Sequence, residues 1–164
     1  MASTNYEYRI SKFDSKYRNS EGIYTKDEWT SIGDVGKMYD GKTFTMSEYL
    51  RVENQYLAFI NKICVMDNIR DAQITGLEDY KHVCTFSDGE TLTRMDDILK
   101  VAKSCLREEY WCRLTMTSNF VHFGYDYYLY VCCSLNYNAM VNLAREHGLF
   151  VEEMESPYKE CEDS

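Results

Sequence analysis

The sequence contains no long hydrophobic run and no segment with the composition of a secretory signal. No apolar stretch approaches the roughly 18 residues that a membrane-spanning helix requires. Residues 1–7 lack both the basic start and the apolar run of a signal peptide. We therefore expect a cytoplasmic protein with no membrane partner.

Paired cysteines are also missing. The cysteines are odd in number, and none of them forms a Cys-x-x-Cys pair; they are residues 64, 84, 105, 112, 132, 133 and 161. The histidines, at positions 82, 122 and 147, show no metal-ligand spacing with the cysteines. This pattern favours reduced, mostly buried thiols, and we expect neither a metal site nor a cofactor.

Basic residues are too few to suggest the positive stripe that binds a phosphate backbone. The chain has 18 Lys and Arg against 27 Asp and Glu, giving a net charge of −9, which argues against nucleic acid as a direct partner. Acidic residues are concentrated in residues 148–164. Two interpretations of this acidic end stay open: it aids solubility, or it attracts a basic protein and speeds association.

No catalytic motif is recognisable. Gly33-Asp34-Val35-Gly36 lacks the Lys-Ser/Thr pair and the strand-to-helix context of a phosphate loop. Glu108-Glu109 and Glu152-Glu153 are adjacent in sequence, so the side chains of each pair point to different sides and form no carboxylate dyad. We expect a protein that is not an enzyme and has no catalytic residues.

The sequence does contain clear strand patterns. In residues 127–133, the odd-numbered side chains from Leu129 onward face an apolar core, whereas Tyr128, Tyr130 and Cys132 face the opposite side. Residues 6–13 alternate in the same way and predict a half-buried strand.

Three helices are predicted from capping signals and apolar spacing. Thr45 and Glu48 form a capping box, and apolar residues then recur every three or four positions up to Met66. A second amphipathic helix is expected over residues 93–106, and a third over residues 137–147.

The remaining segments give weaker signals. Residues 112–117 and 149–151 are strand-like, and short strands are expected around residues 73–77 and 82–86. Residues 14–41 are rich in Ser, Asp, Asn and Gly, which predicts an extended connection or a short irregular helix.

This order of elements predicts an α+β fold. We expect a single domain over residues 1–156, with a largely antiparallel sheet and about three helices packed on one face. Residues 157–164 are expected to form an acidic, disordered C-terminal tail.

Two stretches resemble a known family. Residues 24–36 (Tyr-Thr-Lys-Asp-Glu-Trp-Thr-Ser-Ile-Gly-Asp-Val-Gly) and 106–112 (Leu-Arg-Glu-Glu-Tyr-Trp-Cys) resemble bacterial immunity proteins encoded beside contact-dependent growth inhibition toxins or other polymorphic toxins. The resemblance implies a protein that binds one cognate toxin domain, commonly a basic nuclease, and blocks its active site or its access to substrate. An acidic surface suits such a partner.

The fifteen tyrosines favour a protein-binding surface, because tyrosine combines apolar area with a hydroxyl group. Whether the tyrosine-rich sheet face is exposed or covered by residues 14–41 stays open. The predicted partner-binding residues are acidic residues and tyrosines on turns, on the sheet and beyond the last helix: Asp34, Asp40, Tyr125, Asp126, Tyr128, Tyr130, Glu152, Glu153 and Glu155.

Two alternative functions stay open. An acidic secretion chaperone would hold an extended effector segment and would form a homodimer. A small cysteine-dependent enzyme would use a residue such as Cys84 or Cys133, and would need a thiol whose pKa lies well below that of free cysteine.

Overall fold

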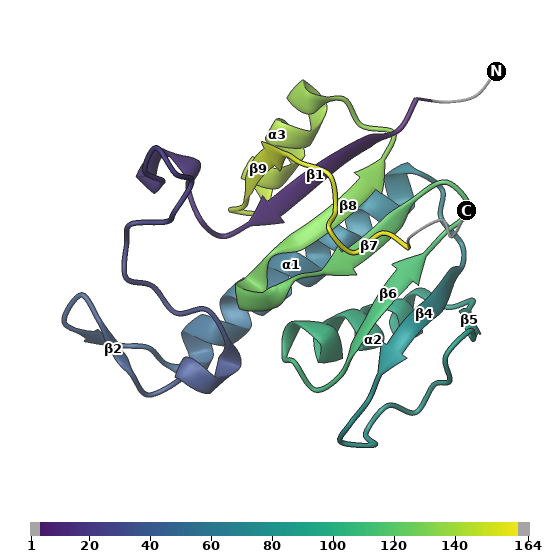
Figure 1. Cartoon of the computed structure of the whole chain (residues 1–164), viewed down its shortest axis with the longest axis horizontal. Helices are drawn as coiled ribbons and strands as arrows, with labels where there is room; N and C mark the ends of the chain where they lie inside the picture. Colours follow the sequence, from purple (N-terminus) through teal and green to yellow (C-terminus); the bar gives the residue numbers. More distant parts are fainter. Residues whose placement is uncertain (1–3, 161–164) are drawn as a thin grey trace.

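Seven antiparallel strands form one sheet in the computed structural model, which describes residues 4–160 (Figure 1). The strand order is β5-β4-β6-β7-β8-β1-β9. The strands are β1 Tyr6–Ser11, β4 Ala72–Glu78, β5 Thr91–Leu92, β6 Trp111–Thr115, β7 Phe120–Phe123, β8 Leu129–Cys133 and β9 Phe150–Glu153. A separate hairpin joins β2 Met38–Tyr39 to β3 Lys42–Thr43.

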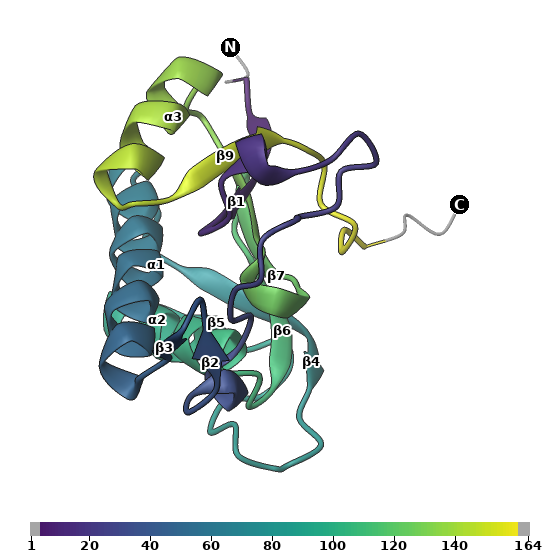
Figure 2. The same cartoon turned by 90° about the vertical axis from the view of Figure 1, so that its left-hand side faces the viewer.

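Three helices cover one face of this sheet (Figure 2). They are α1 Met46–Met66, α2 Met95–Leu106 and α3 Tyr137–Glu146. The Thr45 hydroxyl accepts a hydrogen bond from the backbone N–H of Glu48, which caps the start of α1. The fold is therefore α+β, as the sequence predicted, and the helices predicted after Thr45, after Thr93 and after Asn136 are confirmed.

The core lies between the helices and the sheet. Tyr56, Phe59 and Ile60 of α1 are fully buried, and so are Ile10 and Leu129 in the facing strands. Burying an apolar side chain of this size contributes roughly 1.5–3 kcal/mol. No helix within residues 4–160 has the length and apolar character needed to span a membrane.

Two chain segments partly cover the opposite face of the sheet, on the right in Figure 2. At one end, Phe13 and Arg18 contact Tyr128. Further along, the C-terminal segment crosses the strands, with the ring of Tyr158 5.6 Å from Trp111 and 5.8 Å from Tyr130. The tyrosine-rich face is therefore partly covered by the protein's own chain, at Tyr128 and at Tyr130.

The position of the C-terminal segment differs from the predicted tail. Residues 157–160 lie on the sheet, because Tyr158 packs between aromatic rings and Arg113 donates to its backbone carbonyl and to Glu160. Disorder was predicted for residues 157–164, of which residues 161–164 lie outside the described residues.

The strand predicted around residues 82–86 is wrong. This segment is a loop, because the Asp79 carboxylate accepts hydrogen bonds from the backbone N–H groups of Val83 and Cys84, at 3.0 and 2.9 Å. Strand β5 follows it instead. The strand around residues 73–77 is confirmed as β4.

Residues 14–41 contain more regular structure than an extended connection. They form short 3-10 turns at Ser15–Tyr17 and Ile32–Asp34, and they provide strand β2 of the small hairpin. Trp29 is buried against Phe44, with the rings stacked at 4.5 Å, so this segment contributes to the core.

Candidate functional site

Three connections that are distant in the sequence line one shallow pocket of about 180 Å³. They are the loop after β4, the turn between α2 and β6, and the turn between β7 and β8. We use the name acidic–aromatic surface for the exposed acidic and aromatic residues at this pocket and beside it, which are Glu78, Tyr80, Glu108, Glu109, Tyr125 and Asp126; one exposed cation, Lys81, also lines the pocket.

Two tyrosines of this surface are strongly exposed. Tyr80 is 85% exposed and Tyr125 is 70% exposed. Each presents a large, rigid apolar area that ends in a hydroxyl, a combination typical of residues that anchor protein interfaces. Glu78, Glu108 and Glu109 line the same pocket and outnumber its one basic residue, Lys81, so apolar contact and net negative charge occur together there.

The turn that carries Tyr125 and Asp126 is held from beneath by Tyr127. Asp126 and Tyr127 have positive φ angles of 61° and 70°, a conformation that aspartate tolerates in turns but that is uncommon for a bulky residue such as tyrosine. The Tyr127 side chain is buried, its hydroxyl donates to the Tyr49 hydroxyl at 2.9 Å, and its carbonyl accepts from Tyr56 at 2.8 Å. Tyr125 and Asp126 are thereby left on the outside.

The turn that carries Glu108 and Glu109 is held by a buried ion pair. Arg107 donates to both carboxylate oxygens of Glu53, at 2.7 and 2.9 Å, and Glu53 is 1% exposed. Tyr49 also donates to this carboxylate, at 2.7 Å. A single carboxylate of α1 therefore links the two turns, through Arg107 on one side and through Tyr49 and Tyr127 on the other.

Burial and these hydrogen bonds keep Arg107 charged and the hydroxyls of Tyr49 and Tyr127 protonated. The hydrogen bonds with Glu53 raise the pKa of Arg107 above its ordinary value, and desolvation raises the pKa values of Tyr49 and Tyr127. Both hydroxyls consequently remain protonated donors at neutral pH. The network is a fixed scaffold beneath the surface.

The structure brings together two of the nine predicted partner-binding residues, Tyr125 and Asp126. Asp40 is exposed at the turn of the β2–β3 hairpin, Glu153 is exposed on β9, and the side chain of Glu155 is 83% exposed. These three residues do not line the pocket of the acidic–aromatic surface.

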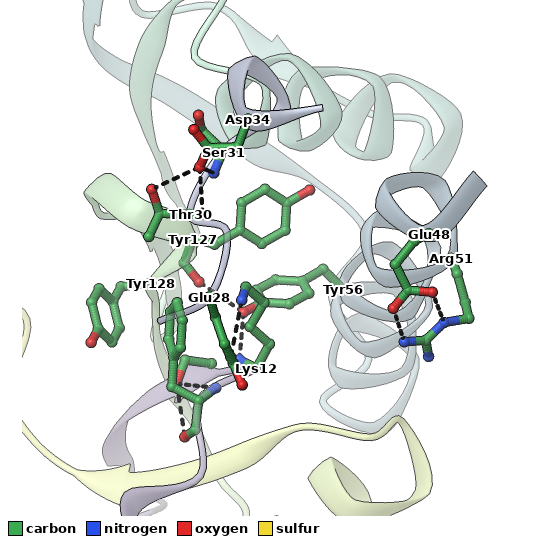
Figure 3. A network of polar contacts seen from close by, with 12 residues as sticks. Lys12, Glu28, Thr30, Ser31, Asp34, Glu48, Arg51, Tyr56, Tyr127 and Tyr128 are labelled. Carbon is green, nitrogen blue, oxygen red and sulfur yellow. Dashed lines mark hydrogen bonds and ion pairs between the residues drawn. The ribbon is translucent and has the colours of Figure 1, made fainter. Parts of the chain in front are cut away.

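The other four predicted residues make contacts within the protein. Glu152 pairs with Arg9 at 2.6 Å and with Arg18 at 3.0 Å. The Tyr128 hydroxyl accepts from Arg18 at 2.9 Å, and Tyr130 is only 7% exposed. Asp34 accepts from the backbone of Thr30 and pairs with Lys37, as the upper part of Figure 3 shows for Thr30 and Asp34.

Sequence analysis missed Glu78, Tyr80, Glu108 and Glu109 as candidate site residues. Glu108 and Glu109 lie within residues 106–112, one of the stretches that carry the family resemblance. As neighbours in the sequence they only exclude a carboxylate dyad, and nothing in their spacing indicates a binding surface. The buried ion pair of Glu53 could have been predicted from the sequence. Glu53 lies between Tyr49 and Tyr56 on the apolar stripe of α1, where a charged residue requires a partner.

The Cys133 thiol lacks the lowered pKa that a nucleophilic cysteine needs. Burial raises the pKa of Cys133 to about 12, which disfavours the thiolate. Cys105 and Cys112 are both buried, with their sulfur atoms 3.7 Å apart. Across residues 4–160, no group of three or more His, Cys, Asp or Glu side chains is arranged to hold a metal ion.

Comparison of the chain with protein-family models, curated proteins and solved structures finds no match. The candidate site therefore rests on its own geometry.

Proposed function

We propose that this protein is an immunity protein that binds a basic toxin domain, such as a nuclease, through the acidic–aromatic surface. Binding there would neutralise the toxin by occluding its active site or its access to substrate. The observation that carries the proposal is the pair of exposed tyrosines, Tyr80 and Tyr125, set among carboxylates at a pocket whose flanking turns are held in place.

The chemistry of the surface suits a cleft rich in Lys and Arg. A nuclease uses such cations to bind its phosphate backbone, and the carboxylates of Glu78, Glu108 and Glu109 would pair with them instead. Tyr80 and Tyr125 would contact the partner through their ring faces, on which guanidinium groups stack favourably. Complementary charge would also speed the capture of the toxin.

The rigidity of the two turns supports strong binding. Groups that are already fixed before association lose less conformational entropy when the complex forms. The Glu53 network fixes the turn after α2 and the β7–β8 turn from inside the domain. Tyr125 and Glu109 are therefore displayed in nearly the geometry in which they would meet the partner.

The test is co-expression of the protein with the product of the neighbouring reading frame, followed by purification of the complex and a growth assay. We expect a tight one-to-one complex with a basic toxic domain, and protection of cells that produce both proteins. Purification of a secreted effector held unfolded by a dimer would instead support the chaperone alternative and contradict the proposal.

A matched pair of variants tests whether the acidic–aromatic surface is the binding site. Tyr125→Ala should weaken the complex by more than about 1 kcal/mol, as expected for an anchor residue. Tyr137→Ala removes another exposed tyrosine, 45% exposed at the start of α3, and should leave affinity unchanged. Equal affinities of the two variants for the toxin domain would show that the acidic–aromatic surface is not the binding site.

A further inference from the structure

A second pocket, of about 710 Å³, lies where the start of α1, the β2–β3 hairpin and the end of β1 come together. Its volume falls within the roughly 300–1,000 Å³ of pockets that hold small molecules. Its lining includes three aromatic side chains, Trp29, Tyr39 and Phe44, and the cation Lys42. It also includes two ion pairs, Lys12 with Glu28 and Arg51 with Glu48. It shares no residue with the acidic–aromatic surface.

Lys12 is the unusual group in this pocket, because its side chain is only 8% exposed. The ammonium nitrogen lies 4.1 Å from the ring centroid of Phe13 and 4.3 Å from that of Trp29. It also lies 3.4 Å from the Glu28 carboxylate (Figure 3). The backbone N–H of Lys12 donates to the Tyr56 hydroxyl at 2.7 Å. The amine is thus held at a fixed position in the pocket wall.

Burial changes the chemistry of this amine. Desolvation lowers the pKa of Lys12 to about 8, although Glu28, Asp34 and Glu48, the charged groups that face it, all act to raise the pKa. An exposed lysine has a pKa of about 10.4 and is almost entirely protonated at neutral pH. A substantial fraction of Lys12 is therefore the neutral amine, which is the nucleophilic form.

We propose that this pocket binds small aromatic aldehydes and that Lys12 forms a reversible imine with them. The lone pair of the neutral amine attacks the carbonyl carbon, and a C–N bond forms as the C=O π electrons move to oxygen. Both amine protons pass in turn from nitrogen to oxygen by way of the Glu28 carboxylate: the first forms the carbinolamine hydroxyl, and the second converts that hydroxyl into a leaving water. The oxygen then leaves as water and a C=N bond forms, so the step needs no oxidant or reductant.

The residues that line this pocket favour an aromatic ligand that carries a carboxylate. Trp29 and Phe44 are stacked at 4.5 Å with an interplanar angle of 13°, and Tyr39 meets Phe44 edge-on at 6.3 Å. These rings provide an apolar, aromatic wall beside the amine. Lys42 is an exposed cation in the same lining, which favours an aldehyde whose ring carries a carboxylate.

The experiment is reductive labelling of the intact protein with 4-carboxybenzaldehyde and sodium cyanoborohydride, followed by peptide mass spectrometry. At neutral pH, we expect Lys12 to be labelled at least about tenfold faster than the exposed Lys42, because its neutral fraction is larger by roughly two orders of magnitude, which outweighs the lower nucleophilicity of a less basic amine. The labelling rate at Lys12 should rise with pH to a plateau above a midpoint near the pKa of about 8. Labelling of Lys12 no faster than that of Lys42, or a rate with no such midpoint, would overturn the proposal.

Two comparisons distinguish labelling that depends on binding in the pocket from the general reactivity of a neutral amine. An aliphatic aldehyde of similar size should label Lys12 several-fold more slowly than the aromatic probe, with little difference at Lys103, an exposed lysine of α2 that does not line the pocket. A Lys103→Arg variant, which changes an exposed lysine outside the pocket, should keep rapid labelling of Lys12. Loss of the aromatic preference at Lys12 would contradict a binding site, whether or not the amine is reactive.

Discussion

Glu53 lies in the middle of α1, where it accepts hydrogen bonds from Arg107 and Tyr49. Removing Arg107 would leave this carboxylate buried without its cation, which typically costs 3–5 kcal/mol. We therefore expect Arg107→Ala to lower the free energy of unfolding by about 3 kcal/mol in urea titrations, since the arginine itself is partly exposed.

The matched control for this variant is Arg51→Ala on the same helix. Arg51 pairs with Glu48, but both side chains are about half exposed, 57% and 45%. Solvent-exposed pairs contribute no more than about 1 kcal/mol. Equal destabilisation by the two substitutions would show that the buried pair has no special role in holding the turn.

His122 gives the protein a predictable response to acid. Its side chain is buried beside Ser156, and burial, together with Arg113 and Lys159, lowers its pKa to about 4. The unfolded chain, with a histidine pKa of about 6.5, binds the proton first as the pH falls. The stability conferred by neutral His122 is therefore present above pH 6.5 and is lost as the pH falls toward 4.

The expected size of this effect is about 2 kcal/mol of unfolding free energy between pH 7 and pH 5. Urea titrations at the two pH values measure it, and His122→Gln provides the comparison because glutamine does not titrate. The variant should lose less stability over this range than the natural protein. An identical pH dependence of the two proteins would mean that His122 does not titrate with a lowered pKa.

At the scale of elements, the C-terminal segment acts as a third layer on the sheet. Tyr158 packs against Trp111 and Tyr130, and aromatic pairs contribute roughly 0.5–1.5 kcal/mol beyond the area that they bury. We expect Tyr158→Ala to lower the free energy of unfolding by about 2 kcal/mol and to shift the fluorescence of Trp111 as water reaches its ring.

Tyr80→Ala is the control for Tyr158→Ala, because Tyr80 is 85% exposed. An exposed substitution of this kind changes stability by within about 0.5 kcal/mol. If Tyr158→Ala were as mild as Tyr80→Ala, the segment would contribute little to the fold.

Elements fixed by local interactions could be predicted from the sequence. The starts of α1 and α3 follow from Thr45 and Asn136, whose side chains accept hydrogen bonds from residues three positions later. The strand expected around residues 82–86 failed because the side chain of Asp79 competes for the backbone N–H groups of that segment. Apolar alternation does not reveal this competition.

The candidate site depends on contacts between distant parts of the chain, and for that reason it was only partly predictable. Tyr125 and Asp126 were recognised because they occupy a turn between two strands. Tyr80 and Glu109 join them only after α2 and the sheet are packed together. The sequence left open whether the sheet face of Tyr128 and Tyr130 is exposed or covered, and in the structure residues 13–18 and 156–160 contact that face.

At the scale of the whole molecule, negative charge is present well beyond the proposed binding surface. A net charge of −9 would attract any basic partner, with an association rate that falls as salt screens the field. General attraction and specific recognition must therefore be separated. Variants that change the net charge equally but at different places achieve this.

The most direct test is isothermal titration calorimetry of the co-purified toxin domain with the natural protein, Glu109→Lys and Glu21→Lys. Both acidic residues are exposed, and only Glu109 belongs to the acidic–aromatic surface. We predict that Glu109→Lys weakens binding by about tenfold or more, or roughly 1.4 kcal/mol, whereas Glu21→Lys has only a small effect that disappears at high salt. Equal losses for the two variants, or no loss for Glu109→Lys, would contradict recognition through this surface.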